Sequence, residues 1–276
     1  MKKLVMLGLV STAVLGTLGT KPAMAKELVG DTTGDIEFVE NDGDIDYDKD
    51  VTDPGDGGKD QGDGTDIIPP EDGDATTGPL RFNYVPAIQF GQNRLATKTQ
   101  NYYALFDTIT KKTDGTTEEK PTFFEVVDLR GGTKGWKVSV KNDRIFTSEG
   151  KSIKATLSFT DMTIQSNSNI VDDVKFPTVP EQSVETVIGN DAGSSVVLAQ
   201  ADSAKEQGYG SWSVRMGDTS KRTTGQGKDG TAETGDVDGT KKDRNLGVKL
   251  SVDGGQVLEI GKNYSTDLVW TLESAL

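Results

Sequence analysis

Short runs of alternating or β-branched residues, separated by turn residues, recur along the chain from Leu80 onward. In Gly247–Val252, for example, every second residue is apolar, and these side chains share one face because successive residues of a strand point to opposite sides. Such alternation is typical of antiparallel sheets with one face on a core and one in water. The runs that we expect to form strands are Arg81–Val85, Phe123–Val127, Trp136–Val140, Ile153–Phe159, Ser195–Leu198, Ser211–Met216, Gly247–Val252 and Leu268–Leu272.

This pattern predicts one all-β domain over residues 80–276, an immunoglobulin-like antiparallel β-sandwich. Two turn pairs, Gly131-Gly132 and Asp253-Gly254, are expected to close hairpins between neighbouring strands. Residues 217–245 are polar and lack a strand pattern over a length well beyond that of a hairpin loop. We expect a long mobile surface loop there, and the alternative is a segment that covers a binding site and orders on contact.

Residues 1–25 have the pattern of a secretory signal peptide. Two lysines precede the apolar run Leu4–Leu18, and the small-x-small sequence Ala23-Met24-Ala25 follows it. The apolar run is roughly fifteen residues long, which is short of the ~20 needed to span a bilayer. We therefore expect an exported chain that begins at Lys26 after processing.

Residues 26–79 form an acidic segment with 18 acidic and 3 basic residues, a balance of 3 − 18 = −15. Its few apolar residues cannot bury enough surface to offset chain entropy, so we expect a disordered linker that like-charge repulsion keeps extended. Carboxylates alternate from Asp42 as they do in calcium loops, but Tyr47 stands at the glycine position and Asp53 at that of the final glutamate. The sequence therefore favours a solvated spacer without a specific metal site, and weak, diffuse cation binding is the alternative.

Charge and composition exclude several classes of function. From Leu80 onward, 30 − 3 − 3 = 24 basic residues accompany 44 − 18 = 26 acidic ones, so the domain is nearly neutral and has no basic stripe for nucleic acid. The chain contains no cysteine and no histidine, which removes disulfides, the usual zinc ligands and the commonest general base. We expect neither a cofactor nor enzymatic activity. A glycosidase-like pair of carboxylates is the remaining alternative, and no motif singles one out.

Two tryptophan motifs are the most informative feature of the domain. Trp136-Lys137-Val138 and Trp270-Thr271-Leu272 each place a tryptophan and an apolar residue on one face of a strand. With the phrases around them, the chain resembles the WxL-domain surface proteins of low-GC Gram-positive bacteria, although Val138 stands where the family motif has leucine. The matching stretches, within residues 78–276, are Asp128–Val140, Tyr264–Leu272, Tyr84-Val85-Pro86, Phe90-Gly91, Gly210–Val214 and Gly247–Val252.

The resemblance implies a secreted protein at the extracellular cell-wall surface that binds peptidoglycan non-covalently. It also implies complexes with two kinds of companion, a membrane-tethered protein that binds WxL domains and a small sortase-anchored surface protein. Adhesion to host matrix proteins is implied for some members only. The sequence contains no Leu-Pro-x-Thr-Gly sorting motif, so we expect attachment without a covalent link. The rival function is a structural or adhesin subunit that binds protein partners by strand or surface association.

The tryptophans themselves have two possible roles. Aromatic rings suit a glycan because the C–H face of a sugar packs on the π surface. In this hypothesis the two motif strands lie side by side, and lysines near the first motif meet carboxylates or phosphates of the wall. The alternative is that the rings fill the core, which is the role we expect for Trp212. The candidate ligand-binding residues are Trp136, Val138, Trp270, Leu272, Lys134 and Lys137.

Overall fold

The structure, a computed structural model, describes residues 36–37, 50–58, 62–168, 170, 172–188, 194–223 and 243–275. The chain divides into two units, Met1–Phe38 and Val39–Leu276, and the account below concerns the second. The predicted signal peptide, and residues 42–49 of the calcium-like run, lie outside the described residues.

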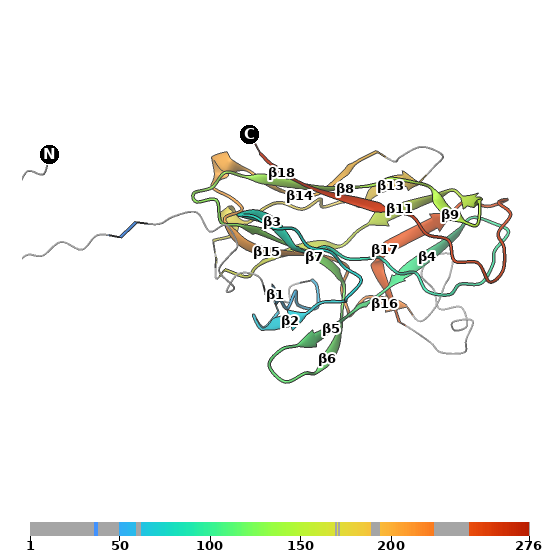
Figure 1. Ribbon diagram of the computed structural model, residues 1–276, viewed down its shortest axis with the longest axis horizontal. Coiled ribbons are helices and arrows are strands. Elements are labelled where there is room, and N and C mark those ends of the chain that lie inside the picture. The colour runs from blue at the N-terminus through green and yellow to red at the C-terminus, as the bar shows by residue number, and fades with distance from the viewer. Residues whose placement is uncertain are drawn as a thin grey trace, which may run out of the picture. The chain divides into compact units, whose positions relative to one another are not determined.

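The second unit is built from antiparallel strands (Figure 1). Its described residues contain only two short 3-10 helices besides, η2 (Asp173–Lys175) and η3 (Ser203–Lys205). The strands are β1 (Val51–Thr52), β2 (Asp66–Ile68), β3 (Leu80–Tyr84), β4 (Gln100–Leu105), β5 (Asp107–Lys111), β6 (Thr117–Lys120), β7 (Thr122–Asp128), β8 (Trp136–Asn142), β9 (Phe146–Ser148), β10 (Lys151–Ile153), β11 (Ala155–Phe159), β12 (Met162–Ser166), β13 (Val184–Ile188), β14 (Val196–Ala201), β15 (Gly210–Met216), β16 (Arg222–Thr223), β17 (Arg244–Val252) and β18 (Leu268–Ser274).

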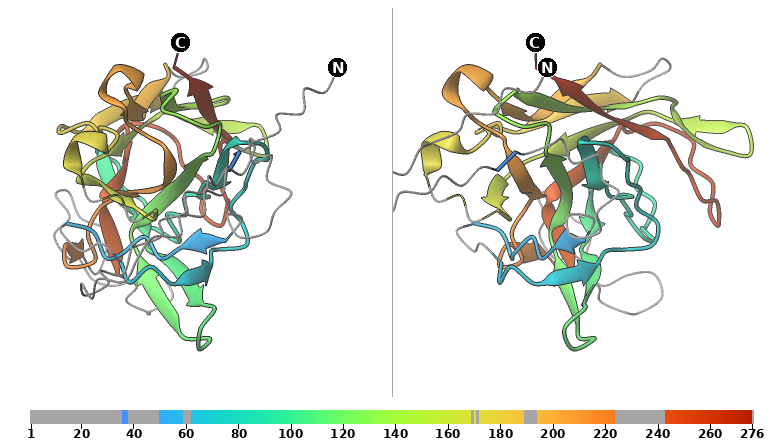
Figure 2. Two further views of the ribbon diagram at one scale, coloured as in Figure 1. Left: turned by 90° about the vertical axis from the view of Figure 1, so that its left-hand side faces the viewer. Right: turned by 60° about the vertical axis from the view of Figure 1, so that its left-hand side comes forward.

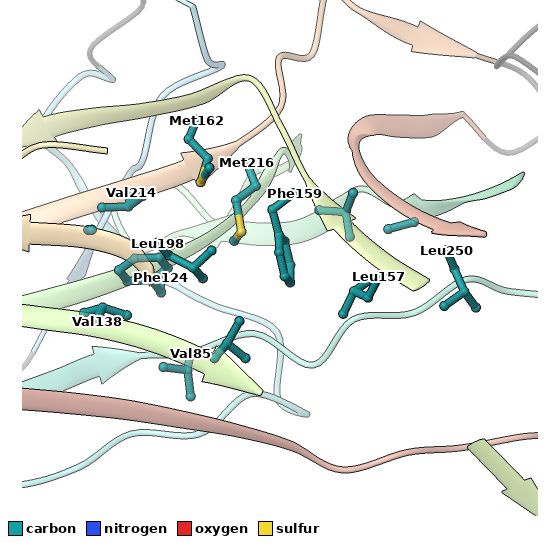
Figure 3. Close-up of a cluster of buried hydrophobic side chains, with 14 of the residues drawn as sticks. Val85, Phe124, Val138, Leu157, Phe159, Met162, Leu198, Val214, Met216 and Leu250 are labelled. Carbon is teal, nitrogen blue, oxygen red and sulfur yellow. The ribbon is translucent and has the colours of Figure 1, made fainter. Parts of the chain in front are cut away.

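Three sheets surround the main hydrophobic core. They have the strand orders β12-β15-β7-β3, β14-β8-β18 and β13-β11-β17-β16, with β4 also paired to β17. Side chains from all three meet in the core, among them Phe124 of β7, Val138 of β8 and Phe159 of β11 (Figure 3). The predicted all-β class is confirmed, and a strand lies at each predicted run. Three sheets rather than two enclose the core, and an immunoglobulin-like order of strands stays a prediction.

The two predicted hairpin turns join strands of different sheets instead. Gly131-Gly132 lies between β7 and β8, and Asp253-Gly254 follows β17 on the way to β18. Strand β7 pairs with β3 and β15, whereas β8 pairs with β14 and β18. The prediction of hairpins was wrong because turn residues specify only a reversal of the chain, and distant strands compete for the same edges.

The predicted loop over residues 217–245 is shorter at both ends than expected. Arg222 pairs with Asn245, and Thr223 with Arg244, so β16 and the start of β17 form a short ladder. Between them, residues 224–242 lie outside the described residues, and the predicted role of that stretch stays a prediction.

Strand β7 is buried on both faces, which accounts for its nearly continuous apolar sequence. Phe124 and Val126 point into the main core, while Phe123 on the opposite face joins a second cluster with Ile67 of β2 and Ile109 of β5. This second cluster lies between the small sheet β1-β2-β5-β6 and strands β3 and β7. The β5–β6 hairpin projects from the small sheet (Figures 1 and 2). The N-terminal part of the unit therefore covers a face that the domain would otherwise leave exposed.

The expected disorder of residues 26–79 does not hold for residues 50–58 and 62–79. Val51 and Ile67 are 6% and 1% exposed, and Asp53 is 1% exposed. The Asp53 carboxylate lies 3.1 Å from the Lys120 ammonium, whose side chain is only 4% exposed. Composition failed here because few apolar residues suffice where strand pairing and a buried ion pair add to them, and the face they cover belongs to a distant strand.

Replacing Asp53 by Ala tests whether the segment around it packs against the rest of the unit in this way. The substitution leaves the buried Lys120 ammonium without one of its partners, so we expect the free energy of unfolding to fall by about 3 kcal/mol. Asp50→Ala is the matched control, since its ion pair with Lys112 joins side chains that are 44% and 39% exposed. That control should cost less than about 1 kcal/mol. Urea unfolding monitored by circular dichroism measures the free energy of unfolding of both variants. Equal losses of stability would contradict the burial of the Asp53–Lys120 ion pair.

Candidate functional site

The two tryptophan motifs come together because β18 pairs with β8 in an antiparallel ladder. Trp270 lies opposite Val140, Leu272 opposite Val138, and Ser274 opposite Trp136. Directly opposed residues of an antiparallel pair share a face, so both motifs point to the same side of the sheet β14-β8-β18. The predicted juxtaposition of the two strands is therefore present, and the shared side faces the core.

The two apolar residues of the first motif have no surface to offer a ligand. Trp136 and Val138 are both 0% exposed. The indole Nε1 of Trp136 donates a hydrogen bond to the carbonyl oxygen of Gly208 at 2.9 Å. Gly208 has φ +87°, and a Cβ there would lie 2.6 Å from that Nε1, so only glycine fits. Of the two roles considered for these rings, core packing is the one that Trp136 has in the structure.

The second motif is partly buried at the side of the same core. The ring of Trp270 packs against Phe124 of the facing β7 strand, with the ring centroids 5.5 Å apart. Leu272 packs against the same core cluster. Trp270 lies opposite Val140, four residues along β8 from Trp136, which corresponds to about 13 Å along the strand. The two indoles therefore do not line a single groove.

Trp212 is a core residue, as expected. It is 0% exposed, and its Nε1 donates to the carbonyl oxygen of Tyr209 at 3.0 Å. Its ring meets that of Phe176 edge to face, with centroids 4.9 Å apart. All three tryptophans of the chain thus pack against the same core cluster.

The residues that precede Trp136 hold the two motifs together. The guanidinium of Arg130 forms two hydrogen bonds with the buried carboxylate of Asp128, at 2.8 and 2.7 Å. It also donates to the carbonyl oxygen of Gly135 and to the hydroxyl of Ser274. Arg130 therefore links the end of β7 to the start of β8 and the end of β18, which gives the stretch before the first motif a structural role.

The predicted lysines lie away from the core. Lys137 points to the opposite side of β8 from Trp136, and its ammonium lies 2.7 Å from the carboxylate of Glu273. Lys134 is exposed in the turn before β8. The residues of this outward side, which we call the outer face of the β8–β18 pair, are Lys137, Ser139, Lys141, Val269, Thr271 and Glu273.

Sequence reasoning missed most of this outer face. Lys141 and Thr271 are partly exposed on it, and Val269 is 36% exposed. The alternation that singles out the tryptophan side of each strand also specifies the other side, so the sequence carried the necessary information. The sequence analysis named Lys134 and Lys137 but not Lys141, Val269 or Thr271, because it started from the tryptophan side of each strand.

Glu125 of β7 is a fully buried carboxyl group whose properties could suggest a catalytic acid. It is 0% exposed, and burial raises its pKa to about 7, against the opposing effect of hydrogen bonds to it. Its carboxylate accepts from the Thr52 amide, from Asn83 and Asn167, and from the Ser213 hydroxyl. Because the N-terminal segment covers it, Glu125 has no access to a substrate and acts as a buried hydrogen-bond acceptor.

The described residues contain no group of three or more acidic side chains arranged to hold a metal ion. Nor do they include a helix of the length and apolarity that crossing a membrane requires.

Comparison with known families identifies the domain. The model of the WxL domain, described as surface cell wall-binding, matches residues 25–275. The chain belongs to the WxL family. The match includes the acidic segment as well as the strands that carry the two motifs. Neither the curated proteins nor the solved structures give a match.

Trp136→Ala should destabilise the WxL domain rather than only weaken binding. Removing a fully buried indole leaves a cavity and an unpaired Gly208 carbonyl, so we expect a loss of about 3–5 kcal/mol in the free energy of unfolding. Val269→Ala on the paired strand is the control, and it should cost less than about 1 kcal/mol because the side chain is partly exposed. A Trp136→Ala protein with unchanged stability in urea would show that the ring is not a core element.

The stability of the WxL domain should fall as the pH rises toward neutrality. The pKa of Glu125 is about 7 in the folded state against an ordinary 4.5, so the unfolded chain releases this proton first. This pKa difference should lower the free energy of unfolding of the domain by up to about 3 kcal/mol as the pH rises from about 4.5 to 7. Burial also raises the pKa of Asp107, to about 8, which acts in the same direction.

Comparison with Glu125→Gln separates the contribution of Glu125 to this pH dependence from that of Asp107. The amide cannot ionise, so the stability difference between wild type and variant should shrink from about pH 5 to about pH 7.5. Urea unfolding at both pH values measures it, and a constant difference would contradict the assignment.

Proposed function

We propose that this WxL protein attaches non-covalently to the peptidoglycan of the bacterial cell wall and acts as a surface protein rather than an enzyme. The observation that carries the proposal is the match to a surface cell wall-binding family over nearly the whole chain. A family of binding domains fits a molecule whose fully buried acid Glu125 is covered by the N-terminal segment.

We place the contact on the outer face of the β8–β18 pair and in the turn before it. Lys134, Lys137 and Lys141 supply positive charge there, which suits carboxylates of the stem peptides or phosphates of wall polymers. Thr271, which is partly exposed, adds a hydroxyl group to the same face. The tryptophans support the proposal indirectly, because their packing keeps the two strands paired. Glycan contact by the part-exposed Trp270 and Leu272 stays a prediction.

The family resemblance also supports complexes with companion surface proteins, one membrane-tethered and one sortase-anchored. In this proposal, wall attachment and companion binding use different surfaces of the domain. Binding to host matrix proteins, the role of an adhesin subunit, is the alternative function and rests on resemblance alone.

Sedimentation with purified sacculi tests wall attachment. We compare wild type with Lys134→Ala/Lys137→Ala/Lys141→Ala and with the matched control Lys98→Ala/Lys151→Ala/Lys154→Ala, which removes three exposed lysines elsewhere. Each exposed charge contact contributes about 0.5 kcal/mol, so the loss of three should weaken binding of the first triple variant roughly tenfold. The control variant should bind like wild type.

The outcomes separate the function from the site. Wild-type protein that stays in the supernatant would overturn wall attachment. Equal losses in the two triple variants would keep the function and reject the outer face as its site. Circular dichroism of each variant confirms that the fold is retained.

A further inference from the structure

Strand β18 is the edge strand of the sheet β14-β8-β18 in the part of the chain that the structure describes. Its seven residues pair with β8 without a bulge, and β18 pairs with no other described strand. The flanking hydrogen bonds, Asp143 N–H to the Asp267 carbonyl and Ala275 N–H to the Gly135 carbonyl, set which residues face β8. By the alternation of antiparallel ladders, Val269, Thr271 and Glu273 bond to β8. The backbone groups of Leu268, Trp270, Leu272 and Ser274 therefore point away from the sheet.

This edge has few of the features that prevent strand addition. Natural edge strands are protected by charged side chains, especially lysine, and by proline, bulges or short length. Strand β18 reads Leu-Val-Trp-Thr-Leu-Glu-Ser, so Glu273 is its one charged residue, and it has no lysine, proline or bulge. The edge strand β6, by contrast, reads Thr-Glu-Glu-Lys and is both short and charged. The difference marks β18 as an edge suited to pairing.

The sequence of β18 is complementary to itself. In an antiparallel pair of two β18 strands centred on Thr271, Trp270 of one copy lies opposite Leu272 of the other, and the same contact recurs across the twofold axis. Residues 268 and 274 are also opposite each other, so all seven residues are paired. The four outward-pointing residues become hydrogen-bonded partners, which is the pairing that their backbone direction requires.

Charge also favours this register. Glu273 lies opposite Val269 of the other copy, and Thr271 opposite Thr271, so no carboxylate faces another. A register centred on Trp270 would set Asp267 opposite Glu273 and one indole against the other.

We propose that β18 is an interface between two copies of this chain, which pair edge to edge in an antiparallel ladder centred on Thr271. The sheet β14-β8-β18 then continues across the twofold axis, and the outer faces of the two copies form one surface. The Trp-x-Leu spacing then has a second role, because it sets the tryptophan of each copy opposite the leucine of the other.

The absence of cysteine from the chain permits a direct test by cross-linking. Thr271→Cys places the two thiols opposite each other at a non-hydrogen-bonded pair, where Cα atoms are about 4.5 Å apart, within disulfide range. Val269→Cys is the control, because its counterpart in the second copy lies four residues away, about 13 Å along the ladder. Both positions are on the outer face.

The chain without its predicted signal peptide is oxidised mildly and run on a non-reducing gel. We expect a disulfide-linked dimer for Thr271→Cys and little for Val269→Cys. No dimer at position 271, or equal dimer at both positions, would overturn the proposal. A monomer in both cases is also the result expected if a strand of another protein occupies this edge instead.

Light scattering across a concentration series gives an independent readout. Thr271→Glu sets two carboxylates against each other on the twofold axis and should yield a monomer, whereas Thr271→Val should keep the dimer. Position 271 is partly exposed on the outer face, so both variants keep the side chains of the core. A wild-type monomer at every concentration, or a Thr271→Glu protein of wild-type mass, would refute the pairing.

Discussion

The pairing of β18 with β8 is the interaction on which the rest of the domain depends. It brings together two motifs that lie far apart in the sequence and sets Leu272 opposite Val138 on the core side. Through the contact between Trp270 and Phe124, the same strand ties this sheet to β7 of the facing sheet. Arg130 completes the connection by bonding Asp128, Gly135 and Ser274 at once. The tryptophan motifs, which suggest a ligand site in the sequence, thus pack in the core and hold its sheets together in the structure.

A second constraint is that β7 is buried on both faces. A strand in the middle of a layered structure needs cover on each side, and here the domain alone supplies only one. The acidic N-terminal segment provides the other through Val51, Ile67 and the Asp53–Lys120 ion pair. The cost of burying the Lys120 ammonium is offset by several carboxylates around it, because Lys120 also forms ion pairs with Asp56 and Glu118.

These two constraints separate stability from recognition in the proposed function. Trp136, Trp212 and their hydrogen-bonded glycine and tyrosine carbonyls hold the core, so they do not compete for a ligand. Recognition is left to the other side of the same strands, where lysines and hydroxyl groups alternate with the core residues. Because the outer face and the free edge belong to one strand pair, wall attachment and association of copies would reinforce each other by multivalency.

The sequence by itself determined the all-β class, the position of the strands and the family, because period-two alternation and the two motif phrases are local properties of the chain. It also predicted that the motif strands lie side by side. Only the tertiary structure decided which side of those strands is buried, since both faces of a strand are compatible with the same alternation until the facing sheet is known. The same holds for the residues around Asp53, whose order depends on Phe123 and Lys120, far away in sequence, rather than on their own composition.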